Sequence, residues 1–82
     1  MTDDIPFRST ADSMTPEEYR ETIGLLGLTQ GGAAALLGVD ARTSRKWANR
    51  EREIPPTAAR FLRYLLRAKV RPEDVIRLLA NP

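Results

Sequence analysis

Residues that start helices recur at short intervals along this chain. Three of them cap a helix with a side-chain oxygen and two are prolines suited to a first helical position: Thr15, Thr29, Asp40, Pro56 and Pro72. Between these positions apolar residues recur with helical spacing, and no segment shows the alternation typical of a strand. The pattern predicts an all-α chain, a compact bundle of about five short helices.

The expected helices cover residues 16–26, 30–37 and 41–49, a segment that begins at Pro56, and residues 72–80. In the first, Tyr19, Ile23 and Leu26 follow at i, i+4 and i+7 and predict one buried stripe. Gly27 and Gly38 suit the left-handed residue that commonly ends a helix. The helices are therefore expected to be joined by tight turns.

The length of 82 residues favours a single domain, since domains centre on roughly 100 to 150 residues. Residues 15–82 are expected to form this domain, after a mobile N-terminal arm over residues 1–14 in which apolar periodicity is weak. The longest apolar stretch, residues 33–37, is too short to span a bilayer, and the acidic first residues are unlike a signal peptide. We therefore expect a soluble, cytoplasmic protein.

The chain contains no cysteine and no histidine. Without cysteine it has no disulfide and no thiolate ligand, and without histidine it lacks the commonest metal ligand and general base. Thr43 and Ser44 are hydroxyl residues without a partner base, and the carboxylates gather at predicted helix starts. We therefore expect no enzymatic activity, no metal site and no cofactor.

Charge is unevenly distributed along the sequence. Residues 1–41 carry two arginines against seven acidic residues, a net charge of −5, whereas residues 42–71 carry ten basic against two acidic residues, a net charge of +8. A basic block of this kind can steer a polyanion toward one face of a small domain. A solvated helical surface shows the same composition, so charge alone does not assign a function.

Residues 29–47 predict two short helices that cross through a tight turn. A steep crossing needs a small residue in the first helix, and Ala34 stands there, while Gly38 makes the turn. Val39 and Trp47 supply apolar contacts that hold the second helix against the rest. Tyr19 and Trp47 are therefore expected in the core rather than in a binding site.

The residue order in this region resembles the helix-turn-helix DNA-binding domains of the phage repressor and Cro type. The resemblance extends over residues 15–68 and includes a proline-initiated helix after the motif Gln30, Ala34, Gly38, Val39, Thr43 and Trp47. It implies a lambda-repressor-like fold in which residues 41–49 form a recognition helix for the major groove. The implied DNA-contact residues are Gln30, Ala41, Arg42, Thr43, Arg45, Lys46, Asn49 and Arg50.

Within this set the resemblance directs Ala41, Arg42, Arg45 and Lys46 toward the groove, and Gln30 and Asn49 toward the DNA backbone. Helical geometry agrees, because residues 42, 45 and 46 stand at i, i+3 and i+4 and so share one side of the helix. An arginine fork can also bind guanine at O6 and N7.

Two further expectations concern residues outside the implied contacts. Ser44 stands where that family usually has an aliphatic residue, so its hydroxyl is expected to need a hydrogen-bond partner. The second concerns three arginines on the helix that begins at Pro56, which are expected to form a solvated face: Arg60, Arg63 and Arg67.

The leading hypothesis is a sequence-specific transcriptional regulator, a repressor, that binds double-stranded DNA as a homodimer. The apolar helix over residues 72–80 is the expected dimer surface, with packing onto its own core as the alternative. An antitoxin that also binds a toxin is a special case. The competing hypothesis is a small protein-interaction module, such as a phage-encoded inhibitor, that binds a protein partner through the same helix. Strong salt dependence of duplex binding would favour the regulator.

Overall fold

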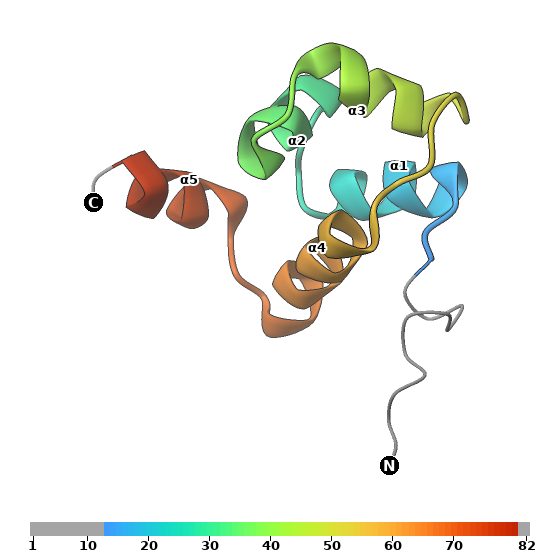
Figure 1. Ribbon diagram of the computed structural model, residues 1–82. Helices are drawn as coiled ribbons and strands as arrows, with labels where there is room; N and C mark the ends of the chain where they lie inside the picture. The colour runs from blue at the N-terminus through green and yellow to red at the C-terminus, as the bar shows by residue number, and fades with distance from the viewer. Residues whose placement is uncertain (1–12, 81–82) are drawn as a thin grey trace.

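The computed structural model describes residues 13–80, in which every regular element is a helix (Figure 1). The five helices are α1 (Pro16–Leu25), α2 (Gln30–Leu37), α3 (Ala41–Ala48), α4 (Pro56–Ala68) and α5 (Pro72–Ala80). The prediction of a small all-α bundle of five helices is therefore confirmed. Each helix begins at the expected residue, and α1 and α3 end one residue earlier than expected.

The first three helices begin where local side chains satisfy free backbone amides. The side-chain oxygens of Thr15, Thr29 and Asp40 each accept the amide three residues further on, at 2.9 to 3.1 Å. The capping box would also direct Glu18 back to Thr15, but its carboxylate instead accepts from Arg63 at 2.9 Å. This contact joins α1 to α4.

The turn between α2 and α3 depends on a left-handed residue. Gly38 has φ 75°, and the Val39 amide donates to the Ala34 carbonyl at 3.0 Å, so the chain reverses within three residues. Ala34 is 3% exposed, and its small side chain allows α3 to pack closely on α2. A side chain at position 38 would meet the conformational penalty that glycine avoids.

Two other helices end at left-handed residues that are not glycine. Arg50, just after α3, has φ 66°, and Lys69, just after α4, has φ 58°. At the end of α3 the last helical carbonyl, that of Ala48, also accepts a hydrogen bond from the Arg20 guanidinium of α1. The end of α3 is therefore fixed by a contact from another helix.

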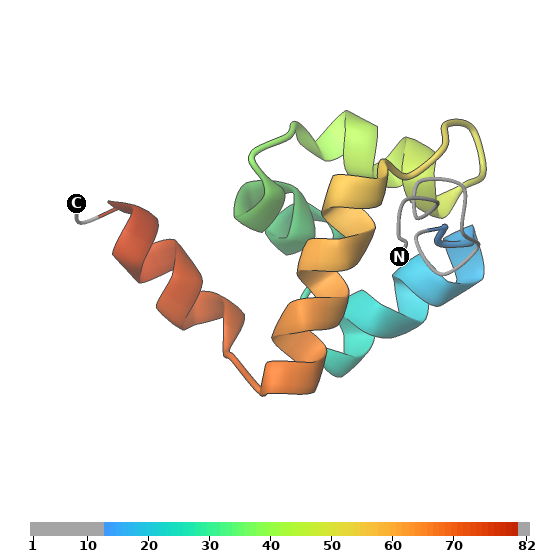
Figure 2. The same cartoon turned by 60° about the horizontal axis from the view of Figure 1, so that its bottom comes forward.

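The core lies between α1, α2, α3 and α4, whose arrangement Figure 2 shows. Tyr19 and Leu62 are fully buried, and Leu65 and Trp47 are nearly so. The rings of Tyr19 and Trp47 meet edge to face, with centroids 5.8 Å apart and planes at 87°. Both aromatic residues therefore occupy the core, as the sequence predicts.

The expected N-terminal arm is shorter than predicted at its inner end. Residues 1–12 of the arm lie outside the described residues. Met14 is 7% exposed and belongs to the core cluster, and the Ser13 carbonyl accepts from Arg63. A single methionine shows no periodicity, which is why the sequence placed it in the arm.

α5 lies at one side of the bundle and diverges from α4 in both views (Figures 1 and 2). Its closest packing is with α2, and Val75 is partly buried against the core. Leu78 and Leu79 remain 72% and 70% exposed. Among the described residues, no helix is both long and apolar enough to cross a membrane.

Candidate nucleic-acid interface

α3 lies along the outer edge of the bundle and presents two different faces (Figure 1). Its inner face carries Ser44 and Trp47, which are 0% and 3% exposed. Its outer face carries Ala41, Arg42 and Arg45, all exposed, so a row of long cationic side chains points away from the core. This is the arrangement that a helix needs to enter a groove with its side chains foremost.

Arg42, Arg45 and Lys46 have no ion pair or hydrogen-bond partner for their side chains within residues 13–80. Lys46 is half-buried, whereas the two arginines are exposed. None of these three charges is held in a hydrogen bond or ion pair within these residues, so their side chains are available to an external anion. The pKa of the nearby Asp40 carboxylate is lowered chiefly by its hydrogen bonds from Thr43, and the positive charges of Arg42 and Lys46 lower it a little further.

The remaining predicted contact residues do not all present free groups. Gln30 is half-buried at the first position of α2, and Asn49 is exposed at the C-terminal end of α3. The Thr43 hydroxyl donates to Asp40 at 2.8 Å and so completes the helix cap. Arg50 donates to the Glu17 carboxylate at 2.5 Å and is therefore already paired with α1.

α1 holds α3 through contacts that the sequence alone did not indicate. The hydroxyls of Tyr19 and Ser44 lie 2.6 Å apart in a buried hydrogen bond, which supplies the partner expected for Ser44. Together with Arg20 on the last α3 carbonyl and Glu17 on Arg50, three side chains from the first half of α1 contact α3 or the residues just after it. Burial raises the pKa of Tyr19, so its phenol stays protonated and can donate or accept in this hydrogen bond. These contacts fix the position of α3 in the bundle.

We expect Tyr19→Phe to lower the free energy of unfolding by about 1 to 3 kcal/mol, because the buried Ser44 hydroxyl loses its partner. Adding Ser44→Ala should recover much of this loss, since no buried hydroxyl is then left unpaired. Urea unfolding of the wild type, both single variants and the double variant measures the coupling between the two positions. Additive single-variant effects would show that the hydrogen bond does not contribute.

The Asp40 carboxylate is expected to contribute to the acid sensitivity of the fold. Hydrogen bonds from the Thr43 hydroxyl and amide hold the pKa of Asp40 below its ordinary value of 3.8. Its contribution to stability is therefore present above that value and is lost as the pH falls through the lower native pKa.

Asp40→Asn retains a capping side chain but cannot titrate, so its melting temperature should fall less steeply below pH 4 than that of the wild type. Glu21→Gln, a change at an exposed residue on α1, is the matched control and should leave the wild-type acid profile unchanged. Identical acid profiles for Asp40→Asn and the wild type would contradict the assignment. The pKa of Glu17 is lowered too, chiefly by a backbone hydrogen bond and also by Arg50, so some acid sensitivity should remain in either variant.

Comparison with known proteins found no matching family model, no matching curated sequence and no matching solved structure.

Proposed function

We propose that this chain is a sequence-specific DNA-binding transcriptional regulator, a repressor, that reads the major groove with α3. The observation that supports this most directly is the outer face of α3, where Arg42, Arg45 and Lys46 have no partner in residues 13–80 while the opposite face is locked into the core. The proposed activity is binding and involves no catalytic step.

The dimensions of α3 suit this role. An eight-residue helix is about 12 Å long and about 10 to 12 Å across with its side chains, close to the width of the major groove. Arg42 and Arg45 would read base edges from the exposed face, and Ala41 leaves space for close approach at the start of the helix. The first amides of α2, beginning at Gln30, would bind a phosphate.

A single short recognition helix contacts few base pairs, so the proposed regulator acts as a homodimer. Two copies would bind half-sites about 34 Å apart, one turn of the duplex. The exposed apolar side chains of α5 support pairing through that helix, in particular Leu78 and Leu79.

Selection of bound duplexes from a random pool tests the proposal directly. We expect enrichment of a two-fold symmetric site. The logarithm of the binding constant should fall by about 0.9 for each phosphate contact when the salt concentration rises tenfold. Absence of both enrichment and duplex affinity at low salt would refute DNA binding.

The exposed apolar face of α5 also supports a second candidate, a protein-interaction module that captures a toxin or another protein through this helix. In that case mutation of α5 would abolish partner binding, whereas mutation of Arg42 and Arg45 would leave it intact. The two candidates therefore differ in which helix carries the activity.

A further inference from the structure

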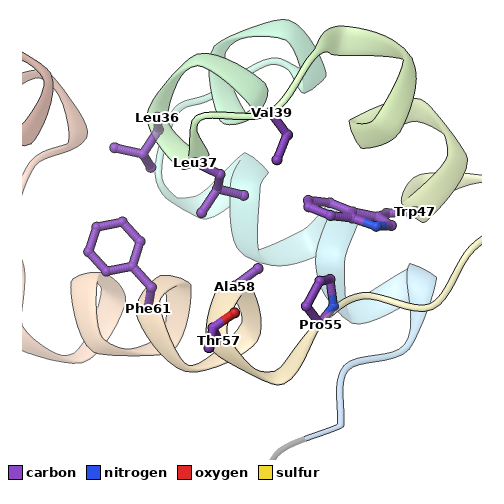
Figure 3. Close-up of a pocket in the computed structure, with 8 residues that line it drawn as sticks. All are labelled: Leu36, Leu37, Val39, Trp47, Pro55, Thr57, Ala58 and Phe61. Atoms are coloured by element: carbon purple, nitrogen blue, oxygen red, sulfur yellow. The ribbon is translucent and has the colours of Figure 1, made fainter.

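An apolar groove of about 300 Å³ runs between the C-terminal end of α2, Trp47 of α3 and the first turns of α4 (Figure 3). Leu37, Val39 and Phe61 are among the residues that line it, and none of its eight lining residues is charged. An engineered apolar cavity of about 150 Å³ holds a benzene ring, so this groove has room for more than one branched aliphatic side chain.

The same chain carries an apolar ridge that its own fold leaves uncovered. On α5, Ile76, Leu78 and Leu79 are 39%, 72% and 70% exposed. The helix packs against α2, whose Leu36 and Leu37 line the groove, and its two leucines remain exposed. Each copy of the chain therefore has one exposed apolar ridge and one open apolar groove.

The net charges of the ridge and the groove indicate which kind of surface can pack against them. Each charged side chain of α5 pairs within residues 71–77: Arg77 with Asp74 at 3.1 Å, and Arg71 with Asp74 at 3.5 Å and with Glu73 at 3.7 Å. Residues 71–77 are thus neutral overall, like the groove, whereas residues 42–70 carry a net charge of +7. Two copies that met through their basic faces would repel each other, but a neutral ridge against an uncharged groove meets no such repulsion.

We propose that the occupant of the groove is α5 of a second copy of this chain. In this dimer α5 of each protomer lies across the groove of its partner, with Leu78 and Leu79 packed against Val39 and Phe61. The exchange is reciprocal, so two copies satisfy both grooves and the assembly closes with two-fold symmetry. This inference rests on the homodimer of the proposed function, although its test needs no DNA.

Two full-length variants test the exchange, each altering one side of the contact. Leu78→Asp places a carboxylate on the ridge, and Thr57→Glu places one at the rim of the groove, at an exposed position in the first turn of α4 where an acidic residue suits the helix. Each should weaken self-association by about 10- to 100-fold, since a carboxylate is costly to bury in an apolar contact. Analytical ultracentrifugation should then report the 9.2 kDa monomer where the wild type gives twice that mass.

Mixing the two variants distinguishes reciprocal exchange from simple pairing of α5 with α5. One intact ridge and one intact groove meet in the mixture, so a heterodimer should form although neither variant dimerises alone. Leu25→Asp is the matched control, because Leu25 is 66% exposed on α1, and it should remain dimeric. Circular dichroism should show the same helix content throughout. Trp47, the single tryptophan, lines the groove, so its emission should shift when the wild type is diluted to monomer.

Four results would overturn the proposal: a monomeric wild type, self-association that survives both variants, no heterodimer on mixing, or a monomeric Leu25→Asp control. A monomeric wild type overturns the exchange whatever its affinity for DNA. A dimer with the recovery described supports the exchange even if no duplex is bound, so the two proposals fail separately.

Discussion

Replacement of Trp47 by alanine is expected to lower the free energy of unfolding by about 3 to 5 kcal/mol. The side chain is 3% exposed, packs edge to face on Tyr19 and forms one wall of the core between α1 and α3. A domain of this size has a total stability on the order of 5 to 10 kcal/mol, so the variant should be largely unfolded at moderate temperature. Urea unfolding followed by circular dichroism measures the change, since the variant has no tryptophan.

Trp47→Phe is the matched control for size and polarity. The indole Nε1 is buried without a hydrogen-bond partner among the described residues, so phenylalanine loses part of the ring but also removes an unsatisfied donor. We expect a markedly smaller destabilisation than with alanine. An alanine variant within 1 kcal/mol of the wild type would contradict the placement of this residue in the core.

Simultaneous replacement of Arg42 and Arg45 by alanine should remove about 2 to 6 kcal/mol of discrimination between a selected site and random duplex, about 1 to 3 kcal/mol for each arginine that reads a guanine. Both side chains are exposed on α3 and lack partners in residues 13–80, so their loss should leave the fold intact. Competition of labelled site against random duplex at fixed salt measures this preference.

Arg60→Ala on α4 provides the control, because its expected effect is at most a uniform weakening of binding with unchanged base preference. Arg42→Ala alone should relax preference at one position of the half-site. If the double variant and the control both selected the same sites as the wild type, α3 would not be the element that reads the bases.

The starts of the helices could be predicted because capping is local. A threonine or aspartate and the amide three residues on are set by neighbouring sequence, and the same holds for a proline at the first position of a helix. Apolar spacing likewise placed Tyr19 and Trp47 in the core, since a helix has a fixed period.

The contacts that hold α3 could not be predicted, because they join residues far apart in the sequence. Ser44 meets Tyr19 across 25 positions, and the Arg20 contact with the end of α3 spans 28. Arg50 illustrates the consequence for the candidate site. Its charge and position suggested a DNA contact, but Glu17, 33 positions earlier, already holds its guanidinium. An acidic residue on another helix leaves no local pattern that would reveal this pairing.

At the left-handed residues Arg50 and Lys69, the residue that would best stabilise the fold differs from the one that supplies positive charge to the surface. A left-handed backbone costs a residue with a side chain about 1 to 2 kcal/mol, and glycine avoids most of that penalty. Glycine at either position would also remove one cation from the basic half of the chain. At these two helix ends, variants selected for heat resistance would therefore tend to lose attraction for polyanions.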